Sequence, residues 1–227
     1  GFKYDSQEDF ARNVVNEIGC VKSDRLDVSG YDSTTMKPED FRIVYGEYEN
    51  FLRSRGKIDF DDMLVFTYEL LSQRPDILRM WQNKFRYILV DEFQDINGIQ
   101  YDTIKLMAGG DRNLFVVGDD DQSIYGFRGA APSIMKRFPE DFPGTIVEYL
   151  NVNYRCSYDI VECSKRIISN NTQRYEKKLQ SAFGAGNSDR VHIVKVESVT
   201  EQNRRIVERI RELNSSGISF SDMAVIY

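Results

Sequence analysis

The sequence of 227 residues predicts an α/β fold built on parallel sheets. Short apolar runs, such as residues 88–90 and 114–117, alternate with longer segments whose apolar residues recur at helical spacing. Three strand-like runs end directly in loops of polar, aromatic or cationic side chains, at residues 91–95, 118–130 and 150–156. Because open α/β sheets bind ligands at the carboxyl ends of their strands, this repeated placement indicates a nucleotide-driven enzyme.

Composition narrows the class of protein. Hydrophobic residues make up 41% of the chain and charged residues 29%, which is typical of a globular protein. No apolar run approaches the roughly 20 residues of a membrane-spanning helix, and the polar start shows no signal peptide. The three cysteines form no CxxC pair, so zinc is not indicated and a cytoplasmic, reducing location is expected.

The net charge of −6 argues against tight DNA binding by this chain alone, because phosphate contacts need Lys and Arg. A local groove remains compatible with this charge, since many of the acids lie in the motifs and on predicted exposed helix faces. The chain also begins without methionine, so an excised or processed piece is expected.

The first part of the chain is predicted to be helical. Ser6 is the expected cap of a helix over residues 6–18, and residues 20–36 are expected to form a loop. Pro38 opens a second helix, which Gly56 ends. Its apolar side chains predict a core stripe, and an aromatic face that stacks on DNA is the alternative.

Asp59 is the expected N-cap of a third helix, with Asp62 placed three residues later as in a capping box. The acids of residues 59–62 are alternatively metal ligands, although capping explains them more simply. Pro75 begins a fourth helix, and its Trp81 is expected in the core.

The strand over residues 88–90 organises the predicted sheet, and its apolar run is typical of a strand covered on both faces. It leads into Asp91 and Glu92, which places two carboxylates at the ligand-binding edge. One acid can hold Mg²⁺ and the other can align an attacking water, although this segment alone is more simply a solvated turn.

A helix over residues 98–107, the strand over 114–117 and a helix over 132–138 are expected next. Residues 138–144 form the predicted linker, with a domain boundary near residue 140. The remaining chain is expected to hold a helix capped by Ser157, a helix from Thr200, and strands over residues 145–149, 191–196 and 223–227.

Three segments together resemble a known family. VDEFQD, GDDDQSIYGFRGA and NYR, in this order, resemble motifs II, III and IV of the UvrD/Rep/PcrA-type superfamily 1 DNA helicases. The thirteen-residue middle motif is the most specific of them. The resemblance implies parts of two RecA-like parallel-sheet domains of the P-loop NTPase type, preceded by a helical portion.

By this resemblance, residues 1–56 would be the end of a helical insertion and residues 57–140 the second half of the first RecA-like domain. Residues 141–227 would be the first half of the second such domain. The protein would be an ATP-dependent helicase of DNA repair or replication restart. It would couple ATP hydrolysis to 3′-to-5′ translocation on single-stranded DNA and to unwinding at duplex junctions.

The resemblance also assigns roles to residues of the ATP site. Asp91 would coordinate Mg²⁺ through water, Glu92 would activate the attacking water, and Gln122 would sense the γ-phosphate. Arg155 resembles an arginine that reaches the γ-phosphate, and Tyr154 resembles a tyrosine that stacks on adenine. An ordinary loop hydrogen bond is the alternative for Gln122.

Three further residues match positions that contact single-stranded DNA in the family: Tyr125, Phe127 and Arg128. Stacking on aromatic rings ignores base sequence, as a translocating motor requires. The family often has tryptophan where Phe127 stands, so base contact there is expected to be weaker. A place in the loop core is the alternative for Phe127.

No GxxxxGK[ST] phosphate loop occurs in this sequence. In the family it lies upstream, and motifs V and VI lie downstream. The chain alone is therefore expected neither to hydrolyse ATP nor to unwind DNA, and its exposed sheet edges would favour self-association.

Two alternatives remain open. One is the helicase part of a helicase–nuclease, although such relatives usually carry a lysine near Asp121. The other is a non-catalytic scaffold of the same family that binds DNA or protein, which the intact Asp91, Glu92, Gln122 and Arg155 disfavour.

Overall fold

The computed structural model describes residues 6–110, 113–124, 126, 132–172, 174–185 and 191–227. The chain divides into two units. Unit 1 consists of Gly1–Tyr149 and Asn171–Glu176, and unit 2 of Leu150–Asn170 and Lys177–Tyr227. The chain therefore leaves unit 1 after Tyr149, returns to it for six residues, and leaves it again.

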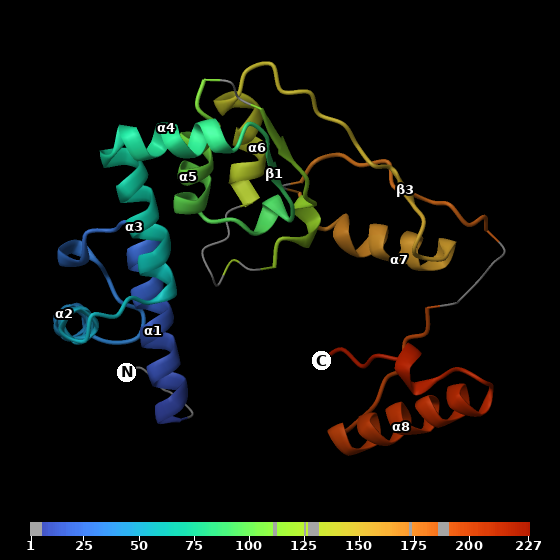
Figure 1. Ribbon diagram of the computed structural model, residues 1–227. Helices are drawn as coiled ribbons and strands as arrows, with labels where there is room; N and C mark the ends of the chain where they lie inside the picture. The colour runs from blue at the N-terminus through green and yellow to red at the C-terminus, as the bar shows by residue number, and fades with distance from the viewer. Residues whose placement is uncertain (1–5, 111–112, 125, 127–131, 173, 186–190) are drawn as a thin grey trace. The chain divides into compact units, whose positions relative to one another are not determined.

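Unit 1 begins with four helices, whose course can be followed in Figure 1: α1 (Gln7–Ser23), α2 (Pro38–Ser54), α3 (Phe60–Gln73) and α4 (Pro75–Lys84). Ser6 caps α1 through a bond from the Asp9 main-chain nitrogen, and Asp59 and Asp62 form the capping box of α3. These caps confirm the predicted helix starts.

The first core cluster joins α1 to α2. Val14, Ile18, Val21 and Phe41 are buried together, with Tyr45 and Tyr48 packed against them. This confirms the core stripe predicted for α2 in part, because Phe51 of the same helix is 53% exposed. The loop predicted for residues 20–36 is wrong at its start, since Val21 continues the apolar face and α1 runs on to Ser23.

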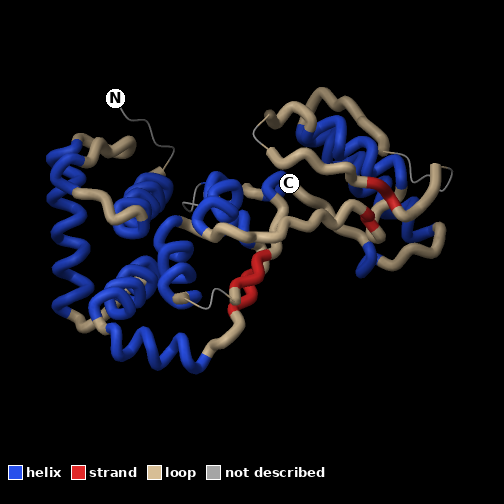
Figure 2. The backbone as a smooth tube through the Cα atoms, turned by 90° about the horizontal axis from the view of Figure 1, so that it is seen from above, coloured by secondary structure: helices blue, strands red, loops and turns tan. Residues whose placement is uncertain are grey.

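The sheet of unit 1 contains two parallel strands, β1 (Ile88–Val90) and β2 (Leu114–Val116), seen in Figure 2. Two helices accompany them: α5 (Gly98–Ala108) and α6 (Pro132–Asp141). A second core cluster of Phe93, Tyr101, Ile134 and Phe138 packs against the inner side chains of both strands. The parallel pairing confirms the predicted α/β class.

Two predictions near the strands need correction. Residues 138–144 are not simply a linker, because α6 continues to Asp141 and Phe138 is 6% exposed in the core. Trp81 is only half-buried, and its ring stacks on Phe85 with the ring centroids 5.5 Å apart.

Unit 2 holds a short parallel pair, β3 (Val152–Asn153) and β4 (Gln180–Ser181), with α7 (Tyr158–Ile168) and α8 (Val199–Ser215). Ser157 precedes α7 as predicted but makes no side-chain cap bond.

The strands predicted over residues 145–149, 191–196 and 223–227 do not form among the described residues. A strand requires a hydrogen-bonded neighbour, and none of these segments has one in the described parts of the chain. Their apolar side chains are consequently open to solvent: Ile193 and Ile226 are both 95% exposed. No helix within the described residues is both long and apolar enough to cross a membrane.

Candidate functional site

The carboxyl end of β1 delivers two acids, as predicted. Asp91 and Glu92 follow Val90 directly, and both side chains are exposed. The next residue, Phe93, is held by its core contacts and by a main-chain bond to the oxygen of Val117 (2.9 Å). Exposed carboxylates on an anchored backbone are available to a cation or a water, and Mg²⁺ prefers such oxygen ligands.

The backbone at Glu92 is left-handed, with φ 49° and ψ 43°. A side chain with a Cβ loses about 1–2 kcal/mol in this conformation, so surrounding contacts must hold it. Its main-chain nitrogen donates to Asp91 Oδ1 (2.9 Å), and its oxygen accepts from the nitrogen of Asp95 (2.9 Å). These bonds hold the turn at Glu92 between its neighbours Asp91 and Asp95.

The Gln94 side chain links the VDEFQD segment at the end of β1 to the GDDDQ segment after β2. Its side chain is 1% exposed, and Nε2 donates to Glu92 Oε2 (2.7 Å). Its Oε1 accepts from the main-chain nitrogen of Asp119 (2.9 Å), and its main-chain oxygen accepts from Ser123 Oγ (3.1 Å). Sequence reasoning did not single out Gln94, although it lies inside the VDEFQD motif.

Asp119 organises the described part of the motif III loop. Its Oδ1 accepts from the nitrogen of Asp121 (3.1 Å), and its Oδ2 accepts from Gln122 Nε2 (2.8 Å). The structure thus brings Glu92 and Gln122 into one hydrogen-bonded series through Gln94 and Asp119. In this arrangement the Gln122 amide is bound within its own loop.

Gly118 leaves room for the Gln94 side chain. A Cβ at this position would lie 2.6 Å from Gln94 Oε1, 2.8 Å from Met135 Cε and 3.1 Å from the Phe93 nitrogen. The first two distances are shorter than any contact a real Cβ makes. A side chain at position 118 would therefore force the Gln94 amide or the Met135 side chain to shift.

The same loop is tied to the returning segment Asn171–Glu176. Arg174 Nε donates to Asp121 Oδ1 (2.8 Å), and the main-chain nitrogen of Tyr175 donates to Asp120 Oδ2 (2.7 Å). The Tyr175 hydroxyl donates to the oxygen of Met135 (3.1 Å). Sequence reasoning missed these residues, because nothing local in the sequence pairs position 174 with position 121.

Asp119, Asp120 and Asp121 each place one carboxylate oxygen within 4.8 Å of the others, a spacing that a metal ion could bridge. The guanidinium of Arg174 already supplies positive charge to Asp121, which accounts for one of the three acids. We therefore keep Asp91, the exposed acid at the end of β1, as the candidate magnesium ligand.

Two candidates lie in unit 2. Asn153 Oδ1 accepts from the main-chain nitrogens of Arg155 (2.9 Å) and Cys156 (2.8 Å), which fixes the turn after β3. The Arg155 side chain is exposed, and Tyr154 is 77% exposed. Both groups are thus open to a ligand. The three DNA-contact candidates, Tyr125, Phe127 and Arg128, lie outside the described residues.

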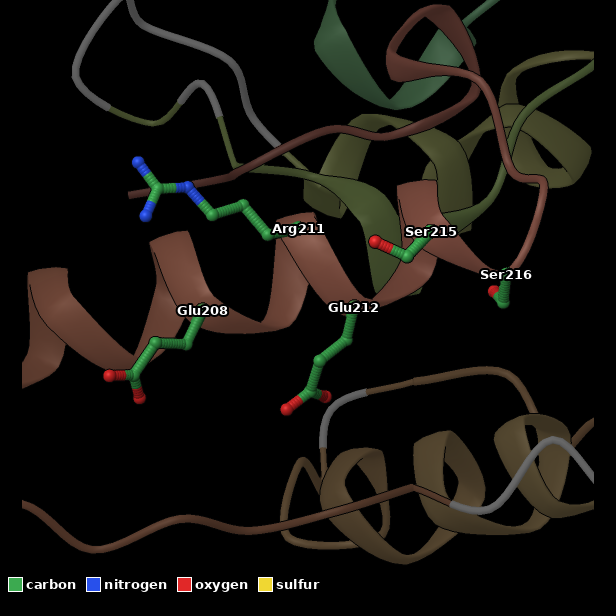
Figure 3. A pocket seen from close by; sticks show the side chains of 5 residues that line it. All are labelled: Glu208, Arg211, Glu212, Ser215 and Ser216. Carbon is green, nitrogen blue, oxygen red and sulfur yellow. The ribbon is translucent and has the colours of Figure 1, made fainter.

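A surface hollow lies on α8 and at its C-terminal end. It is lined by Glu208, Arg211, Glu212, Ser215 and Ser216. Figure 3 shows the Arg211 side chain pointing away from the two glutamates, so these groups do not converge on a common ligand.

The chain is similar to known proteins over most of its length. The UvrD/REP helicase N-terminal domain matches residues 4–143, and the UvrD-like helicase C-terminal domain matches residues 149–227. The YjcD protein of Bacillus subtilis is 39% identical over 229 residues, which cover 98% of this chain and 29% of that protein.

Two proteins named ATP-dependent DNA helicase PcrA are also similar. The one from Staphylococcus aureus is 34% identical over 95% of this chain, and the one from Leuconostoc citreum is 33% identical over 95% of it. The chain spans less than a third of the length of each of these relatives, 28% and 29% respectively.

Proposed function

The chain belongs to the UvrD/REP helicase family, and we propose that it is the central portion of an ATP-dependent DNA helicase. The protein would couple ATP hydrolysis to 3′-to-5′ translocation on single-stranded DNA and to unwinding at duplex junctions. Repair or replication restart in the cytoplasm is the proposed setting. The similarity to PcrA over 95% of this chain supports the proposal.

One structural observation carries the mechanism. The acid predicted to activate water, Glu92, is joined through Gln94 to the main chain of Asp119, which also holds Gln122. A motor needs its hydrolytic group connected to the element that responds to DNA. Direct hydrogen bonds between motif II and motif III provide such a connection.

In the proposed reaction, Asp91 would hold Mg²⁺ and Glu92 would align the water that attacks the γ-phosphate. Gln122 would leave Asp119 to donate to the γ-phosphate, as an uncharged amide can. Arg155 would meet the charge that develops on the phosphoryl group, a contribution worth about 10³–10⁵ in rate for the arginine fingers of GTPases. Tyr154 would stack on adenine.

The DNA-contact roles of Tyr125, Phe127 and Arg128 remain part of the proposal. Aromatic stacking contributes about 1–3 kcal/mol per base without regard to sequence. A phosphate loop from outside this chain would complete the ATP site, because this sequence contains none. We therefore expect no ATP hydrolysis from the chain alone.

The test is ATP hydrolysis by the full-length protein with and without single-stranded DNA. Glu92→Gln should lower the DNA-stimulated rate about 10²- to 10⁴-fold, as expected for loss of a general base. Glu140→Gln, at an exposed residue of α6, is the matched control and should hydrolyse ATP normally. Absence of any DNA-stimulated hydrolysis, with DNA binding retained, would favour a scaffold instead.

A further inference from the structure

Each end of the Gln94 side-chain amide is bonded to a partner on a different motif. It is 1% exposed, so neither end of its amide can be satisfied by bulk water. The nitrogen donates to Glu92 Oε2 and the oxygen accepts from the Asp119 main chain. A buried amide with both ends bonded fixes the relative position of the groups it joins, because breaking either bond leaves a buried polar atom without a partner.

Only an amide of this length satisfies both partners. Glu92 offers an acceptor and the Asp119 nitrogen offers a donor, so the bridging group must donate at one end and accept at the other. A glutamate at position 94 would place a second carboxylate against Glu92. A methionine would fill the space and bond to neither.

The surrounding backbone leaves this bridge little freedom. Ser123 Oγ donates to the main-chain oxygen of Gln94, and Phe93 is bonded to the main chain of Val117. Gly118 approaches so closely that a Cβ there would overlap Gln94 Oε1. A displacement of the main chain at residues 118–119 must therefore move the Gln94 amide.

The strained backbone of Glu92 makes its carboxylate sensitive to that movement. With φ at 49°, the residue is not in a conformation that it would keep without external contacts. Among the described residues, Gln94 Nε2 donates a hydrogen bond to the Glu92 carboxylate at 2.7 Å. The orientation of the carboxylate thus depends on the amide.

We propose that Gln94 is a positioning residue that transmits movement of the motif III main chain at Asp119 to the carboxylate of Glu92. The orientation of the water-activating group then follows the state of the loop that carries the DNA-contact candidates. This inference rests on the proposed function, and it adds a route that does not pass through the Gln122 side chain.

The test uses the full-length protein and two substitutions, Gln94→Met and Gln94→Glu. Both should lower kcat for DNA-stimulated ATP hydrolysis by about 10- to 100-fold, as expected for a misplaced catalytic group. The KM for ATP should change less than about twofold, since ground-state binding is untouched.

Gln100→Met is the matched control. Gln100 also uses its amide in a part-buried bond, accepting from the Asn97 nitrogen (3.0 Å), but this bond caps the start of α5 and does not involve Glu92. It should keep a normal kcat, and any loss of thermal stability it shares with Gln94→Met reports packing only. A kcat loss equal to that of Gln94→Met would overturn the positioning role.

A double-mutant cycle separates the positioning role from a general structural one. If Gln94 acts through Glu92, then Gln94→Met in a Glu92→Gln background should change the residual rate less than about twofold. An undiminished further loss would show that Gln94 acts elsewhere and would overturn the inference.

The failures of the two proposals are distinguishable. Wild-type protein without DNA-stimulated hydrolysis would refute the proposed function and the inference with it. Wild-type activity that needs Glu92 but survives both Gln94 substitutions would leave the function standing and refute the inference alone.

Discussion

Arg174 binds the carboxylate of Asp121 with two of its nitrogens, Nε at 2.8 Å from Oδ1 and Nη2 at 2.5 Å from Oδ2. The two residues lie 53 positions apart in the sequence. Their side chains are 22% and 13% exposed, so the pair is largely shielded from water. This contact holds the returning segment Asn171–Glu176 against the motif III loop of unit 1.

Arg174→Met should lower the free energy of unfolding by about 1–3 kcal/mol, because Asp121 loses its charged donor in a mostly buried place. Arg174→Lys should recover only part of this loss, since a lysine cannot form the paired bonds. Thermal or urea unfolding of the full-length protein measures the change.

The control for this experiment is Arg204→Met on α8. Arg204 pairs with Glu208, but their side chains are 59% and 51% exposed, and exposed pairs contribute little. An Arg204→Met loss as large as that of Arg174→Met would contradict the importance given to the Asp121 pair.

A substitution of Lys22 should also lower the stability of the fold strongly. Its Nζ lies 2.6 Å from Glu49, 2.8 Å from Asp59 and 2.7 Å from Asp62, and its side chain is 4% exposed. Lys22→Met would leave three carboxylates facing one another and should cost about 3–5 kcal/mol of unfolding free energy. Adding Asp62→Asn should restore part of the loss, and a purely additive double mutant would speak against this explanation.

Acid should destabilise the N-terminal helices through Glu17. Burial opposes its ionisation, but hydrogen bonds from Thr35, the Thr34 nitrogen, Ser33 and Tyr31 outweigh burial and lower the pKa of Glu17 below its usual value. A lowered folded-state pKa contributes stability that is present above the unfolded value, about 4.3, and is lost as pH falls through the folded one.

The free energy of unfolding of Glu17→Gln should therefore be lower than that of the wild type at neutral pH. Below about pH 4.3 it should also change less with pH than the wild-type value does. Unfolding curves collected from pH 7 to pH 3 test this. Glu8→Gln, at an exposed position in the first turn of α1, is the control and should follow the wild-type curve. Equal slopes for wild type and Glu17→Gln would reject the assignment.

Gly118→Ala tests the packing of the site without touching a charged group. The added Cβ would displace Gln94 or Met135, so we expect a loss of kcat similar to that of Gln94→Met, about 10-fold or more. Gly46→Ala on α2, where a Cβ meets nothing within 4 Å, is the control. Normal turnover in Gly118→Ala would show that the neighbours adjust without cost to catalysis.

Local sequence signals predicted the local structure well. The caps at Ser6 and Asp59 and the acids after β1 were found, because each depends on neighbours within a few positions. The motifs led from there to the family, which the comparisons show. The roles of the individual site residues stay predictions.

The parts that sequence analysis missed depend on distant partners. The Gln94 side-chain oxygen accepts a hydrogen bond from the main-chain nitrogen of Asp119, 25 residues away, and the Arg174 guanidinium donates to Asp121. The strand predicted over residues 145–149 failed for the same reason, since apolar composition indicates a strand but cannot supply its neighbour. Composition also hid the continuation of α1, because Lys22, Ser23 and Asp24 follow Val21.

The left-handed backbone of Glu92 bears on how this protein can be engineered. Glycine adopts that conformation without penalty, so a search for stabilising substitutions would favour Glu92→Gly by up to about 1–2 kcal/mol. The same change deletes the carboxylate proposed to drive hydrolysis. Selection for heat resistance alone would thus remove the proposed water-activating group, and a library built for that purpose should keep position 92 invariant.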